Sequence, residues 1–191
     1  MGNIVVDGKG AERVVECMLH EPKDADDYRI RLARGDDAFL LWLWANDPET
    51  RKNSFNPQPI AWATHEEWYI RHLSSPDSRI WILECRRVPV GQIRYDRIDA
   101  ETAQISFSVT PRFRGKGMGT RLLNLTVDLA GHELRIQRVQ GITFIDNGAS
   151  RRAFLRAKFA PVEEKTIAGR ACLVFRRPSV ELVEEVGIAV D

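Results

Sequence analysis

Residues 109–123 read VTPRFRGKGMGTRLL and join the end of a predicted strand (105–109) to the start of a predicted helix. Three alternating glycines free the turn of side chains, so several backbone N–H groups can point at one anion. The start of the helix adds unpaired N–H groups and the positive end of the helix dipole. Arg112, Arg114 and Lys116 add positive charge. The stretch is therefore predicted to bind a phosphate group.

The glycine spacing distinguishes this loop from two common phosphate-binding loops. A nucleotide P-loop would need Ser or Thr where Gly117 stands, and a dinucleotide-binding loop would need Gly-x-Gly-x-x-Gly. The pattern that fits is Arg-x-x-Gly-x-Gly, from Arg114 to Gly119. It resembles the pyrophosphate-binding loop of the GNAT N-acetyltransferases, which hold acetyl-coenzyme A (acetyl-CoA). The alternative is an ordinary glycine turn before a helix, but the strand ahead and the amphipathic helix behind favour the acetyltransferase.

A second stretch, residues 146–154 (DNGASRRAF), resembles the segment after the fifth strand of that family. The resemblance implies that the backbone N–H of Val109 contacts the developing oxyanion. It also implies that acetyl-CoA is bound by Val109, Arg114, Gly115, Lys116, Gly117, Met118, Gly119, Thr120, Asn147 and Phe154. Acetyl-CoA is then the cosubstrate, and no metal is expected.

The order of predicted elements indicates a mixed α/β fold. We expect strands at 28–32, 79–84, 90–95, 103–109, 138–145, 161–166 and 171–177, and helices at 38–45, 65–73, 118–130 and 151–157. Residues 46–57 read as a polar loop. The long helix should bury one face, made of Met118, Leu122, Leu125 and Leu129, with Leu123, Val127 and Ala130 beside it. This order matches a single GNAT-like domain over residues 27–177, with a central, mostly antiparallel, splayed sheet flanked by helices. Residues 1–26 and 178–191 would then be an N-terminal extension and a C-terminal tail.

Residues 44–55 (WANDPETRKNSF), followed by His65-Glu66-Glu67-Trp68, narrow the resemblance. They look like the acetyltransferases of the pseudaminic-acid pathway, which acetylate an amino group of a nucleotide-linked sugar. Related stretches occur in ribosomal-protein N-terminal acetyltransferases, so a protein N-terminus is the alternative acceptor. The resemblance and the chemistry of hydroxyl, phosphate and ring recognition single out Asn46, Arg51, Asn53, Phe55 and Trp68 for the acceptor site. The competing interpretations are a solvated loop for Arg51 and Asn53 and a core position for Trp68.

The acid and base of the reaction are not evident. The strand position that often carries a carboxylate in this family holds Gln104, and the position of a frequent tyrosine acid holds Phe154. Candidate bases are His65 and Glu66, with Asp96 and Asp99 as further options, although a histidine at a helix start is more often on the surface. Glu67 fits the acid of a capping box that begins at Thr64. The missing acid and base leave a non-catalytic module that binds CoA or a nucleotide sugar as a second hypothesis.

The composition limits the partners. The chain of 191 residues has 28 basic and 27 acidic residues. It therefore lacks the excess of positive charge that would indicate a nucleic-acid-binding surface. No apolar run is long enough to cross a membrane, and no signal peptide is recognisable, so we expect a cytoplasmic protein. Cys17, Cys85 and Cys172 have no metal-binding spacing. The expected partner is a small-molecule amine, and a homo-oligomer remains open.

Overall fold

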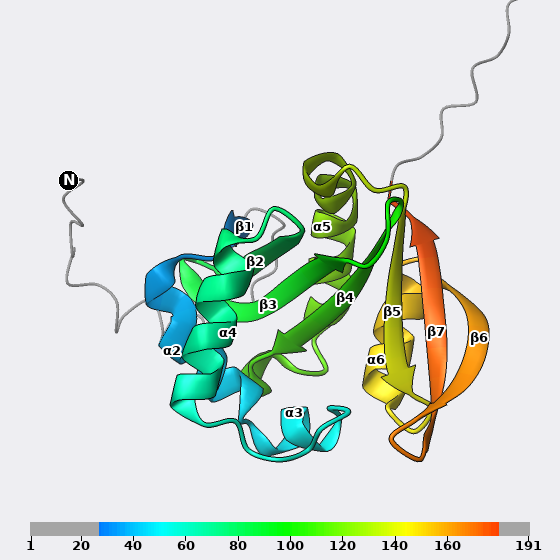
Figure 1. Cartoon of the computed structure of the whole chain (residues 1–191), viewed down its shortest axis with the longest axis horizontal. Coiled ribbons are helices and arrows are strands. Elements are labelled where there is room, and N and C mark those ends of the chain that lie inside the picture. Colours follow the sequence, from blue (N-terminus) through cyan, green and yellow to red (C-terminus); the bar gives the residue numbers. More distant parts are fainter. Residues whose placement is uncertain (1–26, 180–191) are drawn as a thin grey trace, which may run out of the picture.

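The computed structural model describes residues 27–179, which form one seven-stranded sheet with helices on both faces (Figure 1). The strands are β1 (Tyr28–Leu32), β2 (Ser78–Cys85), β3 (Val88–Arg97), β4 (Thr102–Val109), β5 (Arg138–Phe144), β6 (Ala160–Ile167) and β7 (Arg170–Pro178). The helices are η2 (Gly35–Asp37), α2 (Ala38–Ala45), α3 (Pro48–Lys52), α4 (Trp62–Ser74), η3 (Pro111–Phe113), α5 (Met118–Leu134) and α6 (Gly148–Arg156). Expectations for residues 1–26, including Cys17, and for residues 180–191 lie outside the described residues.

The sheet has the order β1-β2-β3-β4-β5-β7-β6, and only β4 and β5 pair in parallel. Their pairing begins at Thr102 with Arg138 and ends at Ile105 with Gly141. Beyond that point β4 continues to Val109 while β5 diverges, as Figure 1 shows. The predicted mixed, mostly antiparallel and splayed sheet is confirmed.

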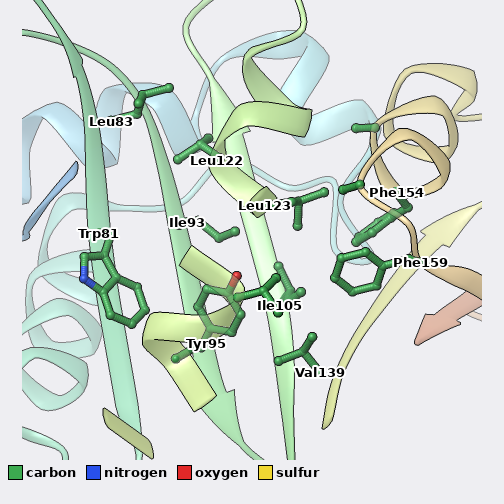
Figure 2. Packing of buried hydrophobic residues seen from close by; sticks show 14 of the residues in the cluster. Trp81, Leu83, Ile93, Tyr95, Ile105, Leu122, Leu123, Val139, Phe154 and Phe159 are labelled. Atoms are coloured by element: carbon green, nitrogen blue, oxygen red, sulfur yellow. The ribbon is translucent and has the colours of Figure 1, made fainter. Parts of the chain in front are cut away.

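The main core lies between the sheet and the helices α5 and α6 (Figure 2). Apolar residues of β2, β3 and β4, such as Trp81, Ile93 and Ile105, pack against Leu122 and Leu123 of α5. On the other face, α2 and α4 form a smaller apolar cluster with Ile80 and Ile82 of β2. The two helix layers leave the face of β5 and β7 opposite α6 without a helix (Figure 1).

The long helix is turned differently from our expectation. Leu125 and Leu129 are 41% and 43% exposed, so their assignment to the buried face was wrong. The buried face is formed by Met118, Leu122, Leu123, Thr126, Val127, Ala130, Gly131 and Leu134. Thr126 is tolerated there because its hydroxyl donates to the Leu122 carbonyl (2.7 Å) and hydrogen-bonds the buried Tyr95 hydroxyl (2.8 Å).

Two further expectations near the N-terminal half were wrong. Residues 46–57 are not all loop, because Asp47 caps the short helix α3 and Pro48 occupies its first turn. The helix α4 begins at Trp62, so Thr64 and Glu67 do not form a capping box at its start. By contrast, the strand at 28–32 and the helix at 38–45 have the predicted bounds.

The C-terminal strand reaches slightly further than the predicted domain boundary. Pro178 belongs to β7, and the next residue, Ser179, is buried. The Ser179 hydroxyl donates to the carbonyl of Ile136 (2.7 Å), and its backbone N–H donates to the carbonyl of Gln137 (2.9 Å). The start of the segment 178–191 is therefore part of the packed domain.

No helix within residues 27–179 is long and apolar enough to cross a membrane.

Candidate active site

The glycine loop adopts the backbone that its sequence predicts. Gly115 and Gly117 have φ angles of +75° and +79°, which residues with a side chain rarely adopt. A Cβ atom at either position would meet no atom within 4 Å, so the space around both glycines is open. Gly119 differs, because a Cβ there would lie 3.0 Å from the Phe107 ring and 3.3 Å from Ala153. Gly115 and Gly117 thus shape an open loop, whereas Gly119 permits the close approach of α5 to its neighbours.

The first turn of α5 presents backbone N–H groups beside this loop. The N–H of Arg121 donates to the carbonyl of Gly117 (3.0 Å) and begins the helical hydrogen bonding. The N–H groups of Met118, Gly119 and Thr120 precede it and have no helical acceptor. Lys116 is exposed, with its ammonium 6.0 Å from the centre of the Phe113 ring. The open loop, the free N–H groups and the helix dipole form a site that fits a pyrophosphate.

The backbone of Val109 faces the gap between β4 and β5. The N–H of Thr110 donates to the carbonyl of Val90 (3.0 Å), and Val109 lies opposite Gly91. In an antiparallel pair, the N–H and C=O of successive residues point to alternate sides. Those of Val109 therefore point away from β3, toward the side where β5 has diverged. The N–H of Val109 is thus available to a carbonyl oxygen placed in the gap.

Arg114 does not point freely at the anion site. Its Nε donates to the carbonyl of Val109 (3.0 Å), and its Nη2 donates to Oδ1 of Asp47 (2.5 Å) and to Oγ1 of Thr50 (3.2 Å). In this structure Arg114 links the loop to α3.

The second motif supplies a helix cap and a core residue. The Asn147 side chain caps α6 by accepting from the N–H of Ser150 (3.1 Å). Phe154 is only 2% exposed and stacks on Phe175, with ring centres 5.1 Å apart. It also covers Gly141, where a Cβ would lie 2.1 Å from the Phe154 ring. Phe154 therefore packs α6 onto the sheet, and its burial leaves little of the ring to line a cofactor site.

The predicted acceptor residues have mixed positions. Asn46 holds the chain at Ile60, accepting from its N–H (2.7 Å) and donating to its carbonyl (3.0 Å). Arg51 donates to the carbonyls of Ala45, Asn56 and Gln58 and to the Ser54 hydroxyl. Both side chains thus organise the segment around α3. Their hydrogen bonds are made within the protein, which does not support a direct phosphate contact from Arg51.

Asn53 and Phe55 lie at the far end of the same segment. The amide of Asn53 donates to the backbone and side chain of Glu49. Phe55 is 38% exposed and packs edge-on against Phe144 of β5, with ring centres 5.3 Å apart. The segment therefore runs from the end of β4, where Arg114 holds it, to the end of β5, as Figure 1 shows below the gap.

The two candidate bases, His65 and Glu66, lie in different environments. His65 is buried and not on the surface as expected, with Nε2 3.1 Å from the carbonyl of Ala38, to which it donates. Burial lowers the pKa of His65 below its ordinary value, and the Ala38 carbonyl only partly offsets this. Its ring contacts belong to α4 and α2 and not to β4, while Glu66 is exposed. Neither position supports a base beside Val109.

Asp96 and Gln104, which the sequence had singled out, belong to a larger group of polar residues on the sheet that was not predicted. Gln92, Arg94 and Asp96 of β3 lie opposite Ser108, Ser106 and Gln104 of β4. They share the face opposite α5, because the alternate residues Ile93, Tyr95, Ala103 and Ile105 belong to the main core. The strict alternation of polar and apolar residues in both strands was the signal that could have revealed this face.

Arg94 is held rigidly on this face. Its Nε donates to Oδ2 of Asp96 (2.6 Å), and its guanidinium carbon lies 4.7 Å from the centre of the Trp68 ring. Ser78 donates to the other oxygen of Asp96 (2.8 Å). Within residues 27–179 the two Nη atoms of Arg94 have no hydrogen-bond partner. Trp68 thus lies beside this polar face and supports an arginine there.

The polar face continues across the joint to β5 and β7. Gln140 donates to Oε1 of Gln104 (3.5 Å) and accepts from Nε of Arg176 (3.5 Å). Arg176 is exposed and 3.8 Å from Glu163 of β6. Gln140 and Arg176 therefore line the part of this face that no helix covers.

Several solved acetyltransferase structures have the same fold as this chain. Spermidine N-acetyltransferase from Vibrio cholerae, solved with CoA and spermine, has a TM-score of 0.71 at 15% identity, over 81% of this chain and 96% of its own. A ribosomal L7/L12 α-N-protein acetyltransferase in complex with CoA has a TM-score of 0.70 at 15% identity, covering 82% and 96%. An aminoglycoside acetyltransferase in complex with CoA has a TM-score of 0.68 at 18% identity, covering 79% and 94%. At these identities the similarity shows a shared fold.

The family follows from the sequence match. A family model described as an acetyltransferase (GNAT) domain matches residues 28–160. That range is most of the chain, and the protein belongs to the GNAT acetyltransferase family. Among curated protein sequences, none matches this chain significantly.

Proposed function

We propose that the protein is an acetyl-CoA-dependent N-acetyltransferase that acetylates a primary amine. The observation that carries the proposal is the N–H of Val109, which faces the gap between β4 and β5 next to the anion-binding loop. Solved neighbours of the same fold contain CoA. The open space at Gly115 and Gly117 fits its pyrophosphate.

In this reaction different parts of the chain have different roles. Acetyl-CoA supplies an activated acetyl thioester; the reaction forms a carbon–nitrogen bond, breaks the carbon–sulfur bond and releases the CoA thiol. The backbone from Gly115 to Thr120 holds the pyrophosphate, and the N–H of Val109 donates to the carbonyl oxygen as negative charge develops there. Gln104 and Phe154 offer no proton exchange, so water takes the amine's proton and supplies the proton that converts the leaving thiolate into the thiol. Positioning and the oxyanion contact then account for most of the acceleration.

For the acceptor we infer a nucleotide-linked amino sugar. This rests on the resemblance of residues 44–55 and on the cationic groups of the open face, Arg94 and Arg176. Solved neighbours contain spermine or kanamycin, which carry several positive charges. Arg94 offers such polycations no hydrogen-bond acceptor, whereas its two Nη atoms, which have no partner within residues 27–179, match a phosphate group.

An amine panel tests the proposal by following release of the CoA thiol. The panel contains nucleotide-linked amino sugars, the same sugars without nucleotide, polyamines and peptides with free N-termini. We expect transfer to be fastest with the nucleotide-linked sugars. Faster transfer to peptides would assign the acceptor to the ribosomal-protein type, and no transfer to any amine would leave a binding module.

Arg94→Gln tests the acceptor assignment more sharply. Loss of a charged partner should raise the KM for the nucleotide-linked sugar about tenfold or more, while the KM for acetyl-CoA stays unchanged. Arg138→Gln removes an exposed arginine paired with Glu101 and serves as the matched control. An equal effect of both variants, or none, contradicts the assignment of Arg94.

A further inference from the structure

The side chain of Arg114 connects the glycine loop, in which it lies, to the strand β4 and to the helix α3. It bonds the carbonyl of Val109 at the end of β4, and it bonds Asp47 and Thr50 at the start of α3. The side chains of Arg114 and Asp47 are 32% and 18% exposed, so this contact is partly shielded from water. A partly shielded ion pair is more persistent than a fully exposed one.

Asp47 is itself fixed by the helix that it caps. Its Oδ1 accepts from the N–H of Thr50 (3.1 Å) and from the Thr50 hydroxyl (3.2 Å) as well as from Arg114. Burial alone would raise the pKa of Asp47, but the hydrogen bonds from Arg114 and Thr50 outweigh it and hold this pKa below its ordinary value. The carboxylate is therefore ionised and oriented before any ligand arrives.

The end of β4 needs such a partner. Pairing with β5 stops at Ile105, so the backbone of Val109 has no strand beside it on that side. The guanidinium of Arg114 satisfies the Val109 carbonyl that the divergence exposes. The same hydrogen bond restrains the backbone torsion angles of Val109 and therefore the direction of its N–H.

We propose that Asp47 is a positioning residue for acetyl transfer, because through Arg114 it fixes the backbone at Val109 that meets the thioester carbonyl. The inference rests on the proposed function. In this role Asp47 acts through Arg114, so its effect falls on the rate of transfer and not on cosubstrate affinity. The same contact ties the segment around α3, which spans the gap, to the strand that holds the oxyanion.

Asp47→Asn is the variant that tests this role. Asn caps a helix about as well as Asp, so α3 should persist while the charge that orients Arg114 is lost. We expect kcat to fall about tenfold, with the Kd for acetyl-CoA within twofold of the wild type and the melting temperature nearly unchanged. Glu49→Gln removes a charge from the same helix without touching Arg114 and should behave as the wild type.

A double-mutant cycle with Arg114→Lys separates coupling from independent damage. Lys keeps a charge but cannot bond Val109 and Asp47 at once, so each single variant and the double variant should lose a similar factor in kcat. Additive losses would overturn the inference, as would a kcat of Asp47→Asn equal to that of the wild type. A fall in kcat matched by equal losses of CoA affinity or stability would also overturn it, since that pattern marks a merely structural residue.

Hydrogen exchange gives a readout that needs no turnover. The Thr110 amide, bonded to Val90, should exchange faster in Asp47→Asn than in the wild type or Glu49→Gln. Unchanged exchange would overturn the link between Asp47 and the end of β4. If the wild type acetylates no amine, the proposed function fails, and the exchange result still decides whether Asp47 fixes the strand.

Discussion

Gly117 offers a direct test of the anion-binding loop, because Gly117→Ala adds a single methyl group. The φ of +79° costs a residue with a Cβ about 1–2 kcal/mol. The added Cβ would meet no atom within 4 Å, so no clash contributes. If the loop relaxes to a negative φ, its N–H groups turn away and acetyl-CoA affinity falls by a factor of about 5–30, as that energy implies. If the loop keeps its shape, the free energy of unfolding falls by the same energy.

Calorimetric titration with CoA and urea unfolding measure the two outcomes. Gly35→Ala is the control, since its Cβ also meets no atom within 4 Å and its φ is not in the left-handed range. Gly117→Val should abolish binding, because the branched Cβ resists this backbone and also fills the loop. Gly119→Val should weaken the fold as well, by crowding Phe107 and Ala153. Unchanged affinity together with unchanged stability in Gly117→Ala would refute the assigned role of this loop.

Gly141→Ala should lower the free energy of unfolding by at least about 1–3 kcal/mol, because its Cβ would lie 2.1 Å from the Phe154 ring; Phe154→Leu in the same chain should recover part of the loss in urea unfolding. Phe154→Leu alone should leave the acyl-transfer step unchanged once stability is matched, and a selective loss of that step would show a catalytic role for the ring. The free energy of unfolding should fall as the pH drops below 6.5, the ordinary pKa of His65. In that range the unfolded chain binds a proton at His65, whereas the buried imidazole of the folded protein, with its lowered pKa, stays neutral. In His65→Gln this slope should shrink. Arg51→Ala should lower the free energy of unfolding by about 2 kcal/mol, through its lost carbonyl contacts, and raise the KM of the acceptor more than that of acetyl-CoA; a raised acceptor KM with unchanged stability would instead favour direct contact with the substrate.

Local signals predicted the elements whose hydrophobic pattern and ends lie close together in sequence. The strand at 28–32 and the helix at 38–45 are of this kind. The start of α4 was misplaced because its N-cap, Ala61, makes no side-chain hydrogen bond and leaves no capping signal. Thr64, which lies inside the helix, resembled an N-cap residue and led to a predicted start that was too late.

The missed features depend on contacts between distant parts of the chain. The buried face of α5 includes Thr126, whose polarity is hidden by a hydrogen bond to Tyr95 on another element. The charge of Arg114 predicted a phosphate contact, because the sequence does not reveal that Asp47, far away in the chain, takes the guanidinium. The glycines at 115 and 117 were predictable, since their backbone requirement is local.

The short parallel joint between β4 and β5 also shapes how the chain folds. The strands β2, β3 and β4 pair with sequence neighbours, as do β6 and β7, so these two units can form from nearby residues. The joint instead requires closure of the segment 106–137, and β1 and β5 likewise pair with strands that lie far away in the sequence. We expect the two units to form early, and the joint to assemble later together with β1 and β5. The divergence that opens the gap beside Val109 therefore also leaves the joint few backbone pairs to offset the entropy of its closure.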